Sequence, residues 1–251
     1  MEIARKPYQG VYNIVRFNWH FYVIAFFIIT LLFYFKNIFG EGFQVFILLF
    51  ATLIFVSILL SLMVSYFVYD VSNLYQFKYL PDLNKKKVLN ITAGFDETSP
   101  ILKNKFPEIN LEICDFYNEK QHTEVSIKRA RKAYPRIENT KTVSTGLLPF
   151  PNDHFDHSLA IFSAHEIRND EERIKFFKEI NRVTRSDGQI FVTEHLRDLY
   201  NFSAYNIGFF HFHSFETWLK TFSRSGLTIK DKIKTTPFVN TFILIKNGDT
   251  P

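Results

Sequence analysis

The stretch VLNITAGFDETS, from Val88 to Ser99, decides how the second part of this chain is interpreted. An apolar run is followed by one glycine, two acids and two hydroxyl residues, and Pro100 comes next. A hydroxyl residue before a proline is typical of the start of a helix. A strand that turns tightly into a helix is a common way to bind a nucleotide, although such turns usually carry two or three glycines. The stretch therefore predicts a strand, a turn and a helix, and it leaves open whether the turn binds a cofactor.

Apolar runs and amphipathic stretches alternate from Leu80 onward. Strands are expected at residues 86–92, 111–116, 140–145, 156–164, 186–195, 227–235 and 238–247. Helices are expected at residues 99–106, 122–134, 171–185 and 213–227. Strands that alternate with helices predict an α/β fold with a mainly parallel sheet that is covered on both faces. In such a sheet, ligands bind beyond the carboxyl ends of the strands, near the point where the strand order reverses.

The part of the chain before Asp70 has a different composition. Residues 17–35 and 42–69 contain no Asp, Glu, Lys or Arg. About 20 apolar residues span a bilayer core, so each run is long enough. A signal peptide has a shorter apolar core and no second span, and buried helices of soluble proteins are rarely so continuously apolar. We therefore expect a transmembrane helical hairpin at residues 17–69, between an N-terminal segment at 1–16 and a domain at 70–251.

Basic residues set the expected orientation of this hairpin. They flank it on the side of the two chain ends: Arg5, Lys6, Arg16, Lys78, Lys85, Lys86 and Lys87. The link between the spans carries Lys36 alone. By the positive-inside rule, both termini and the domain at 70–251 are expected in the cytoplasm.

The formal net charge of +5 does not indicate a nucleic-acid partner. Acids and bases are interspersed after Asp70, and no basic stripe with interleaved aromatic residues is present. A basic segment next to a membrane favours contact with anionic lipid instead. Cys114 is the single cysteine, so an intramolecular disulfide is excluded and a reducing compartment is compatible with the sequence.

Three segments in a fixed order carry a family resemblance. They are LLPFPNDHFDHSLAIFSAHEI (Leu147 to Ile167), VTRSDGQIFVTEH (Val183 to His195) and HSFETWLKTFSRSGL (His213 to Leu227). In order and spacing they resemble the class I S-adenosylmethionine-dependent methyltransferases, specifically the group that acts on small molecules, quinones and lipids. The resemblance covers about Leu80 to Asn247. It implies a Rossmann-like fold with a mainly parallel seven-stranded sheet, and S-adenosylmethionine as the cofactor.

The resemblance also implies a set of cofactor-binding residues. The family's first loop looks like Val-Leu-Asp-Ile-Gly-Cys-Gly-Thr-Gly, in which glycines let backbone N–H groups approach the cofactor closely. This chain has Asn90 at the position of the acid, and Thr92, Gly94 and Asp96 at the positions of the glycines. Asp115 matches the acid that accepts hydrogen bonds from the ribose hydroxyls. The implied cofactor-binding residues are Thr92, Ala93, Gly94, Asp96, Asp115, Ser144 and Ser163.

The replacement of two of the three loop glycines leaves two interpretations open. Either the loop binds the cofactor by an altered arrangement, with Asp96, Glu97 or Thr98 replacing lost contacts, or the site is defunct. Acids and hydroxyls at residues 96–99 also suit a cap of the following helix, and capping is compatible with cofactor contact. Ser144 falls near the position at which many family members hold the adenine amino group with Asp.

Methyl transfer is an in-line displacement at a sulfonium, in which the protein positions the acceptor and removes a proton from a hydroxyl. A base must then lie at the carboxyl end of a strand. We expect His165, with Glu166, and His195 to act there. His211 and His213 form a His-x-His pair, but without a third ligand at recognisable spacing no metal is expected.

The sequence thus predicts a membrane-anchored S-adenosylmethionine-dependent methyltransferase that methylates a lipid-soluble acceptor at oxygen or carbon. Its expected partners are the lipid bilayer and this acceptor. Aromatic residues at 202–212 fit an apolar acceptor pocket and core packing equally well. The alternative function is a catalytically inactive member of the fold that acts as a membrane-tethered interaction scaffold. A hydride-transferring dehydrogenase fits less well, because the glycine pattern departs further from that fingerprint.

Overall fold

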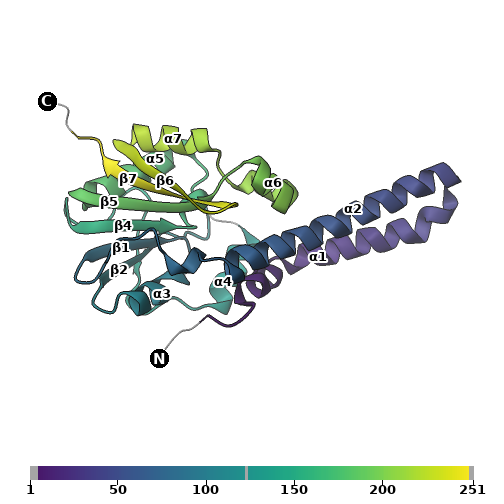
Figure 1. Ribbon diagram of the computed structural model, residues 1–251, viewed down its shortest axis with the longest axis horizontal. Coiled ribbons are helices and arrows are strands. Elements are labelled where there is room, and N and C mark those ends of the chain that lie inside the picture. The colour runs from purple at the N-terminus through teal and green to yellow at the C-terminus, as the bar shows by residue number, and fades with distance from the viewer. Residues whose placement is uncertain (1–4, 122–123, 249–251) are drawn as a thin grey trace.

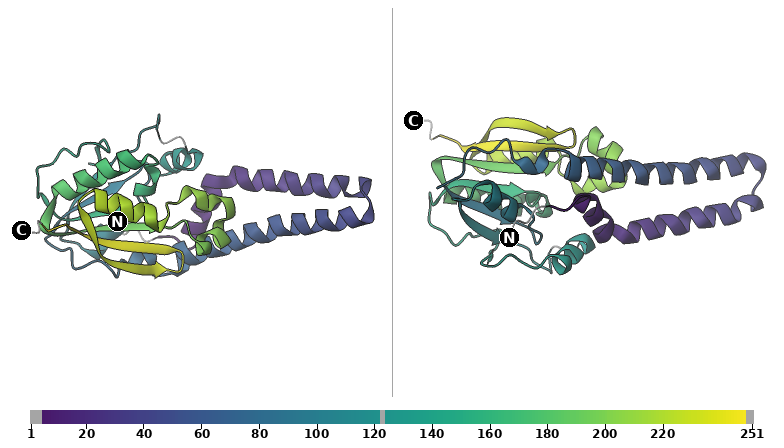
Figure 2. Two further views of the ribbon diagram at one scale, coloured as in Figure 1. Left: turned by 90° about the horizontal axis from the view of Figure 1, so that it is seen from above. Right: turned by 60° about the horizontal axis from the view of Figure 1, so that its bottom comes forward.

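The computed structural model describes residues 5–121 and 124–248 of the chain. These residues form an α/β domain from which two long helices project side by side (Figure 1, Figure 2). The N-terminal segment expected at 1–16 and the helix expected at 122–134 each begin outside the described residues, and the domain expected at 70–251 ends outside them.

Two helices, α1 (Gln9–Phe35) and α2 (Glu41–Tyr66), form the projecting hairpin, and the short turn η1 (Lys36–Ile38) joins them. Both helices are long and apolar enough to cross a membrane by length and composition. Their apolar side chains are largely uncovered, as in Phe27, which is 66% exposed. A helix that is apolar all round and uncovered by the rest of the chain fits the expected transmembrane hairpin. α1 begins at Gln9, ahead of the expected start at residue 17.

Asp70 closes the hairpin at its domain end. This residue lies in η2 (Phe67–Val71), the π-helical turn that follows α2 and precedes η3 (Leu74–Gln76). Its Oδ1 accepts from the backbone N–H of Gly10 at 2.7 Å, and its Oδ2 accepts from that of Val11 at 2.8 Å. N–H groups in the first turn of a helix have no partner within the helix. Asp70, which lies just beyond the C-terminal end of α2, therefore caps the start of α1.

Gly10 lets the two helix ends approach each other. A Cβ built on Gly10 would lie 2.3 Å from the Cβ of Tyr69, far inside van der Waals contact. Arg5 reinforces the same point, because its Nη2 donates to the carbonyl oxygen of Tyr69 at 3.1 Å. Its Nη1 lies 2.8 Å from Oε2 of Glu97, which belongs to the domain.

Seven strands form one mixed sheet in the order β3-β2-β1-β4-β5-β7-β6 (Figure 1). They are β1 (Lys87–Thr92), β2 (Asn110–Asp115), β3 (Lys141–Thr142), β4 (Phe155–Ile161), β5 (Thr184–His195), β6 (Leu227–Thr236) and β7 (Val239–Lys246). β1 to β5 are parallel to one another, and β7 is antiparallel to both β5 and β6. This arrangement confirms the predicted Rossmann-like α/β sheet. β3 is shorter than the strand expected at 140–145, because the chain turns back at Ser144, whose carbonyl oxygen accepts from the N–H of Leu147.

Two apolar layers hold helices and loops against the sheet. On one face, α5 (Asp170–Val183) and α7 (Phe215–Arg224) bury aromatic side chains that include Phe177 and Trp218. On the other face, α3 (Thr98–Lys105) and the segment at 77–83 cover the strands. The remaining elements of the domain are α4 (Val125–Ala133), η4 (Ala164–Glu166), α6 (Leu199–Tyr205) and η5 (Asn206–His211). Figure 1 shows α4 and α6 at the end of the domain from which the hairpin projects.

The hairpin meets the domain at the carboxyl edge of the parallel strands. Phe17 of α1 packs edge-on against Phe95, in the loop after β1, with ring centroids 5.8 Å apart. The hydroxyl of Tyr134, which follows α4, donates to Oδ1 of Asn13 at 2.8 Å. Any ligand site at this edge of the sheet therefore lies next to the base of the hairpin.

Arg129 fastens α4 to a kink in α1. The backbone of Asn18 is non-helical, with φ of −114° and ψ of 17°. Arg129 donates to the carbonyl oxygen of the preceding residue, Phe17, at 2.6 Å. The same guanidinium nitrogen lies 2.7 Å from Nδ1 of His20. α4 is thus bound to the hairpin on both sides of the kink.

His195, the last residue of β5, joins the sheet to the hairpin. Its Nε2 lies 2.8 Å from the hydroxyl of Tyr69, and its Nδ1 lies 3.0 Å from both Oδ1 of Asn201 and the carbonyl oxygen of Phe238. Because both partners of Nδ1 are acceptors, Nδ1 carries the proton and Nε2 accepts from Tyr69. Burial lowers the pKa of His195 to about 4, so the imidazole is neutral at neutral pH.

Replacing Gly10 with alanine should destabilise the chain, because the added methyl group overlaps Tyr69. Overpacking of this kind costs about 1–3 kcal/mol, so the midpoint of thermal unfolding of the full chain in detergent should fall. Gly42→Ala is the matched control, since nothing lies within 4 Å of a Cβ at Gly42 and alanine is the better helix former. Equal midpoints for the two variants would contradict the close approach of the helix ends.

His195 predicts a loss of stability in acid. Its pKa in the folded chain, about 4, lies below the ordinary value of 6.5. As the pH falls, the unfolded chain therefore takes up this proton first, and the contribution of His195 to the free energy of unfolding is lost between pH 6.5 and 4. Denaturant unfolding should show that the difference in free energy of unfolding between the wild type and His195→Gln shrinks across this range. A difference that stays constant would show that His195 is not buried in the neutral form.

Candidate functional site

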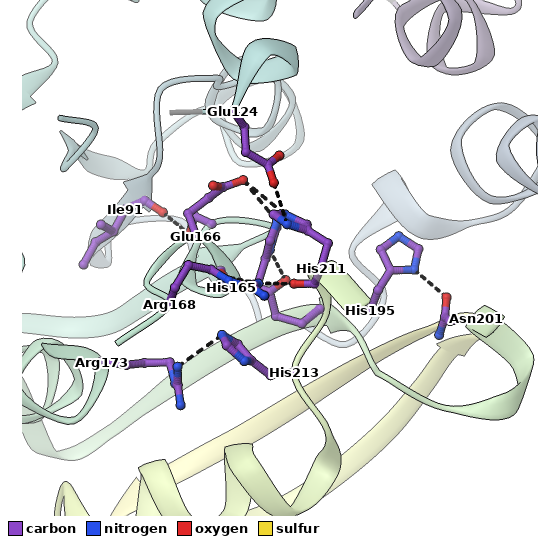
Figure 3. A network of polar contacts seen from close by, with 12 residues as sticks. Ile91, Glu124, His165, Glu166, Arg168, Arg173, His195, Asn201, His211 and His213 are labelled. Carbon is purple, nitrogen blue, oxygen red and sulfur yellow. Dashed lines mark hydrogen bonds and ion pairs between the residues drawn. The ribbon is translucent and has the colours of Figure 1, made fainter. Parts of the chain in front are cut away.

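The strand order reverses between β1 and β4. The chain runs from β1 outward to β2 and β3, and then crosses to β4 on the other side of β1. Ligands of such sheets bind beyond the carboxyl ends of the strands at this point. Two sets of polar side chains lie there. One comes from the loop after β1 and the end of β2, and the other, shown in Figure 3, comes mainly from the chain beyond β4 and β5.

Gly94 gives the loop after β1 its shape. Its φ is +93°, a value that residues with a Cβ rarely adopt, and a Cβ there would lie 2.9 Å from the ring of Tyr117. Thr92 and Ala93 are buried, and Oγ1 of Thr92 donates to the carbonyl oxygen of Cys114 at 3.2 Å. A contact from Thr92 or Ala93 to a ligand would therefore come from the backbone.

The carboxylate of Asp96 caps α3. Its Oδ1 accepts from the backbone N–H of Thr98 at 3.0 Å and from that of Ser99 at 2.9 Å, which confirms the capping interpretation of this segment. Its Oδ2 is buried and has no hydrogen-bond partner among the described residues, and the same is true of Oδ1 of Asn90. Buried acceptors without donors are costly. The loop therefore presents two acceptor atoms that fit a ligand with N–H donors, such as an ammonium group.

An arginine holds Asp115, the last residue of β2. Oδ1 of Asp115 accepts from the N–H of Tyr117 at 2.9 Å, and its Oδ2 accepts from Nη1 of Arg131 at 2.8 Å. The same nitrogen of Arg131 lies 3.4 Å from the carbonyl oxygen of Gly94. The guanidinium lies over the ring of Tyr117, 4.4 Å from its centroid. Arg131 thus lies between the glycine loop and the carboxylate that the resemblance assigns to the ribose.

The two serines of the expected cofactor site have different surroundings. Ser163, after β4, is buried, and its Oγ donates to the carbonyl oxygen of Ile91 at 2.8 Å, which ties the ends of β1 and β4 together. Ser144 is exposed and follows the edge strand β3. The structure brings the other expected cofactor residues to one region: Thr92, Ala93, Gly94, Asp96, Asp115 and Ser163.

A second group, which we call the histidine–glutamate cluster, consists of Glu124, His165, Glu166, Glu194 and His211. All but Glu194 are labelled in Figure 3. Nδ1 of His165 lies 2.6 Å from Oε2 of Glu194, at the end of β5. Nδ1 of His211 lies 2.8 Å from Oε1 of Glu124, just before α4. Nε2 of each histidine faces Oε1 of Glu166, at 3.4 Å from His165 and 3.5 Å from His211.

Charge in the cluster favours protonated histidines. Burial opposes the charged form of His165, but Glu194 and Glu166 outweigh it and raise the pKa of His165 to about 10. Burial alone would lower the pKa of His211, but Glu124 and Glu166 outweigh it and raise that pKa. Burial alone would raise the pKa of Glu166, but hydrogen bonds with the two histidines outweigh it and lower that pKa. In this state His165 already carries its proton, so a role as catalytic base first requires that proton to leave.

The other two histidines considered from the sequence lie apart from the cluster. Both ring nitrogens of His195 form hydrogen bonds where β5 meets the hairpin. Neither nitrogen is therefore available for the expected catalytic role in this arrangement. Nε2 of His213 lies 3.1 Å from Nη1 of Arg173 (Figure 3). Burial and Arg173 lower the pKa of His213 to about 3. The His-x-His pair is therefore divided between two environments.

Sequence reasoning missed Glu124 and Arg131 as members of the site. Both lie on or next to α4, whose position over the carboxyl edge depends on its packing against α1. The available signal is the helix sequence itself, VSIKRARKA, which carries four basic residues on a short helix. Charge density alone does not say which of these side chains turns inward.

Comparisons with known proteins agree with the fold. Residues 119–192 match a family model described as a methyltransferase domain. This segment begins after the glycine loop and ends within β5. No curated protein matches the chain.

Two solved structures have a similar fold. A SAM dependent methyltransferase from Aquifex aeolicus is 14% identical, with a TM-score of 0.50, over 70% of this chain and 93% of that chain. The pyocyanin biosynthetic protein PhzM is 11% identical, with a TM-score of 0.50, over 68% of this chain and 53% of that chain. At such identities the likeness concerns the fold. The chain therefore has the Rossmann-like fold of the class I methyltransferases, and its central part matches the methyltransferase-domain family.

Proposed function

We propose that this chain is a membrane-anchored methyltransferase that transfers a methyl group from S-adenosylmethionine to oxygen or carbon of a lipid-soluble acceptor. One observation carries the proposal. The base of the hairpin packs on the same edge of the sheet at which the strand order reverses, through pairs such as Phe17 with Phe95 and Tyr69 with His195. A ligand site at this edge lies beside the membrane, where a lipid-soluble acceptor is concentrated.

Exposed apolar side chains on α6 and η5 support this orientation. Leu199 is 81% exposed, Ile207 79% and Phe210 58%. α6 lies beside the base of α2 (Figure 1). Grouped apolar residues next to an apolar hairpin suit the interfacial region of a bilayer. Within the aromatic segment at 202–212, Phe210 thus fits a membrane-facing rim better than a packed core.

The loop after β1 fits S-adenosylmethionine in its polar groups. The unpartnered Oδ2 of Asp96 suits the cofactor's amino group, and Gly94 allows its backbone to be approached closely. Asp115 is placed to accept from the ribose hydroxyls when Arg131 releases it. The cofactor supplies the methyl group on its sulfonium. The chain's own contribution is to position the acceptor and to keep water out with the hairpin base.

The second candidate function is a membrane-tethered scaffold without a cofactor. The observation that favours it is the ion pair of Arg131 with Asp115, which occupies the carboxylate needed for the ribose. The replacement of two loop glycines also favours the scaffold function. The two functions differ in one measurable property, the affinity for the cofactor.

Calorimetric titration of the full chain in detergent with S-adenosylmethionine and S-adenosylhomocysteine should give micromolar binding, about 8 kcal/mol. Asp115→Asn should weaken binding about tenfold or more, because it removes a charged acceptor. Arg131→Ala should tighten binding, because it removes the nearer of the two cations at Oδ2 of Asp115 and leaves only Arg136, whose Nε lies 3.7 Å away.

Lys132→Ala, on the exposed side of α4, is the matched control and should leave the affinity unchanged. Weaker binding in Arg131→Ala would show that Arg131 belongs to the cofactor site. If the folded wild-type chain bound neither ligand, the scaffold function would be favoured.

The membrane orientation predicts where a spin label will lie. Ile207→Cys and Leu219→Cys can each be labelled selectively, because the native Cys114 is buried. In reconstituted vesicles, a label at 207 should be more accessible to oxygen than to a water-soluble relaxation agent, and a label at 219, on α7, should show the reverse. Two labels that both behave as exposed to water would refute contact of η5 with the bilayer.

A further inference from the structure

We propose that the histidine–glutamate cluster binds a divalent transition-metal ion, zinc being the best match. The ligands are Nε2 of His165, Nε2 of His211 and a carboxylate oxygen of Glu166. These residues offer ligand atoms that all lie within 4.8 Å of one another. They come from η4 and η5, at the edge of the sheet where the strand order reverses.

The spacing of the ligand atoms suits zinc. Zinc bonds of about 2.0–2.2 Å to nitrogen and oxygen place tetrahedral ligand atoms about 3.4 Å apart. Oε1 of Glu166 lies 3.4 Å from Nε2 of His165 and 3.5 Å from Nε2 of His211. The two imidazole rings are nearly perpendicular, at 83°, with centroids 4.9 Å apart, so they meet at an edge without stacking. The ligand atoms all lie within 4.8 Å of one another, so the two rings must move closer to share one ion. Binding would also displace the Nε2 proton of each histidine.

Both histidines have the outer partner that metal-bound histidines usually have. The Nδ1 of a ligating histidine commonly donates to a carboxylate, which fixes the ring and leaves Nε2 for the metal. Glu194 serves His165 in this way at 2.6 Å, and Glu124 serves His211 at 2.8 Å. The side chain of Glu194 is 1% exposed and that of Glu166 is 5% exposed. His165 is 12% exposed, whereas His211 and Glu124 are 24% and 44% exposed. The arrangement is therefore a partly buried, hydrogen-bonded site that opens on the side of Glu124.

Arg168 holds the two ligand-bearing turns together. Its Nη1 lies 3.4 Å from the carbonyl oxygen of His165, and its Nη2 donates to that of Phe210 at 3.2 Å. A further hydrogen bond joins Nη1 to the carbonyl oxygen of His211. Figure 3 shows Arg168 next to the cluster. The separation of His165 and His211 is thus fixed by backbone contacts that do not involve the imidazoles.

The donor set points to the zinc class. Two imidazole nitrogens and one carboxylate suit zinc and similar transition metals, whereas magnesium and calcium prefer oxygen ligands throughout. Three protein ligands leave a fourth position for water, as in catalytic zinc sites. If the proposed methyltransferase function holds, an oxygen of the acceptor would take that position. Metal binding itself does not depend on that function.

The sequence predicted no metal because the His211 and His213 pair lacked a third ligand at recognisable spacing. The structure shows why spacing could not point to this cluster. His213 turns to Arg173, and the two proposed ligands next to His211 come from the turn after β4. Ligands that are brought together by the fold of a sheet have no fixed separation in sequence.

The test uses the full chain in detergent, freed of metal with a chelator and titrated with Zn²⁺ alone by calorimetry. We expect one equivalent to bind, and Co²⁺ in its place should give the visible absorption of a tetrahedral site. His211→Ala and Glu166→Gln should abolish saturable binding. Glu124→Gln, which changes an outer partner, should weaken binding about 10–100-fold. His154→Ala, a histidine outside the cluster, is the control and should bind zinc as the wild type does.

Thermal unfolding without metal checks that each variant is folded, and the partly exposed Glu124 provides a substitution that removes no ligand. Zinc affinity that is unchanged in folded Glu166→Gln and Glu124→Gln would overturn the proposal. So would a folded wild-type chain that shows no saturable binding. Because no S-adenosylmethionine is present, the outcome is independent of the cofactor titration, which reports on the loop around Asp115.

Discussion

The carboxylate of Asp70 is the contact on which the rest of the structure depends. It stands at the end of α2 and accepts from the first N–H groups of α1, so the two helices of the hairpin share one closed end. The first N–H groups of a helix have no partner within the helix, so Asp70 supplies the acceptors that the start of α1 lacks. Because Arg5 links the same point to Glu97, the closed end is also fixed to the loop after β1. The position of the candidate site beside the base of the hairpin follows from this one capped helix end.

Two arginines organise the two halves of the site in the same manner. Arg131 connects the carbonyl oxygen of Gly94 to Asp115, and Arg168 connects the turns that carry His165 and His211. The halves meet where Ser163 binds the carbonyl oxygen of Ile91. The difference lies in what each arginine does to its half. Arg131 occupies the carboxylate that the proposed cofactor site would use, whereas Arg168 binds backbone oxygens and does not engage the imidazoles or carboxylates.

Local patterns were sufficient for much of the fold. Apart from the shortened β3, the strands, the apolar stripe of α5 and the turn at Gly94 lie where the sequence predicts them, because periodicity and turn chemistry are local properties. The sequence did not reveal α6, a short helix whose Leu199 and Phe202 point outward. Nor did it reveal the contacts of Glu124 with His211 or of Arg131 with Asp115. Those contacts exist because α4 is packed across the sheet edge by Asn13 and Phe17 of a helix more than a hundred residues away.

If the hairpin spans a bilayer as proposed, the attachment of α4 to the kink in α1 couples the domain to the physical state of the lipid. Hydrophobic helices adjust to bilayer thickness by changing their tilt. α4 contacts α1 through Arg129 and, two residues further on, holds Asp115 through Arg131. A change of tilt in a membrane-spanning hairpin would therefore reach, through a helix of nine residues, the ion pair in the cofactor half of the site. Under that condition, bilayer thickness becomes a variable in assays of this protein, in the same sense as pH or ionic strength.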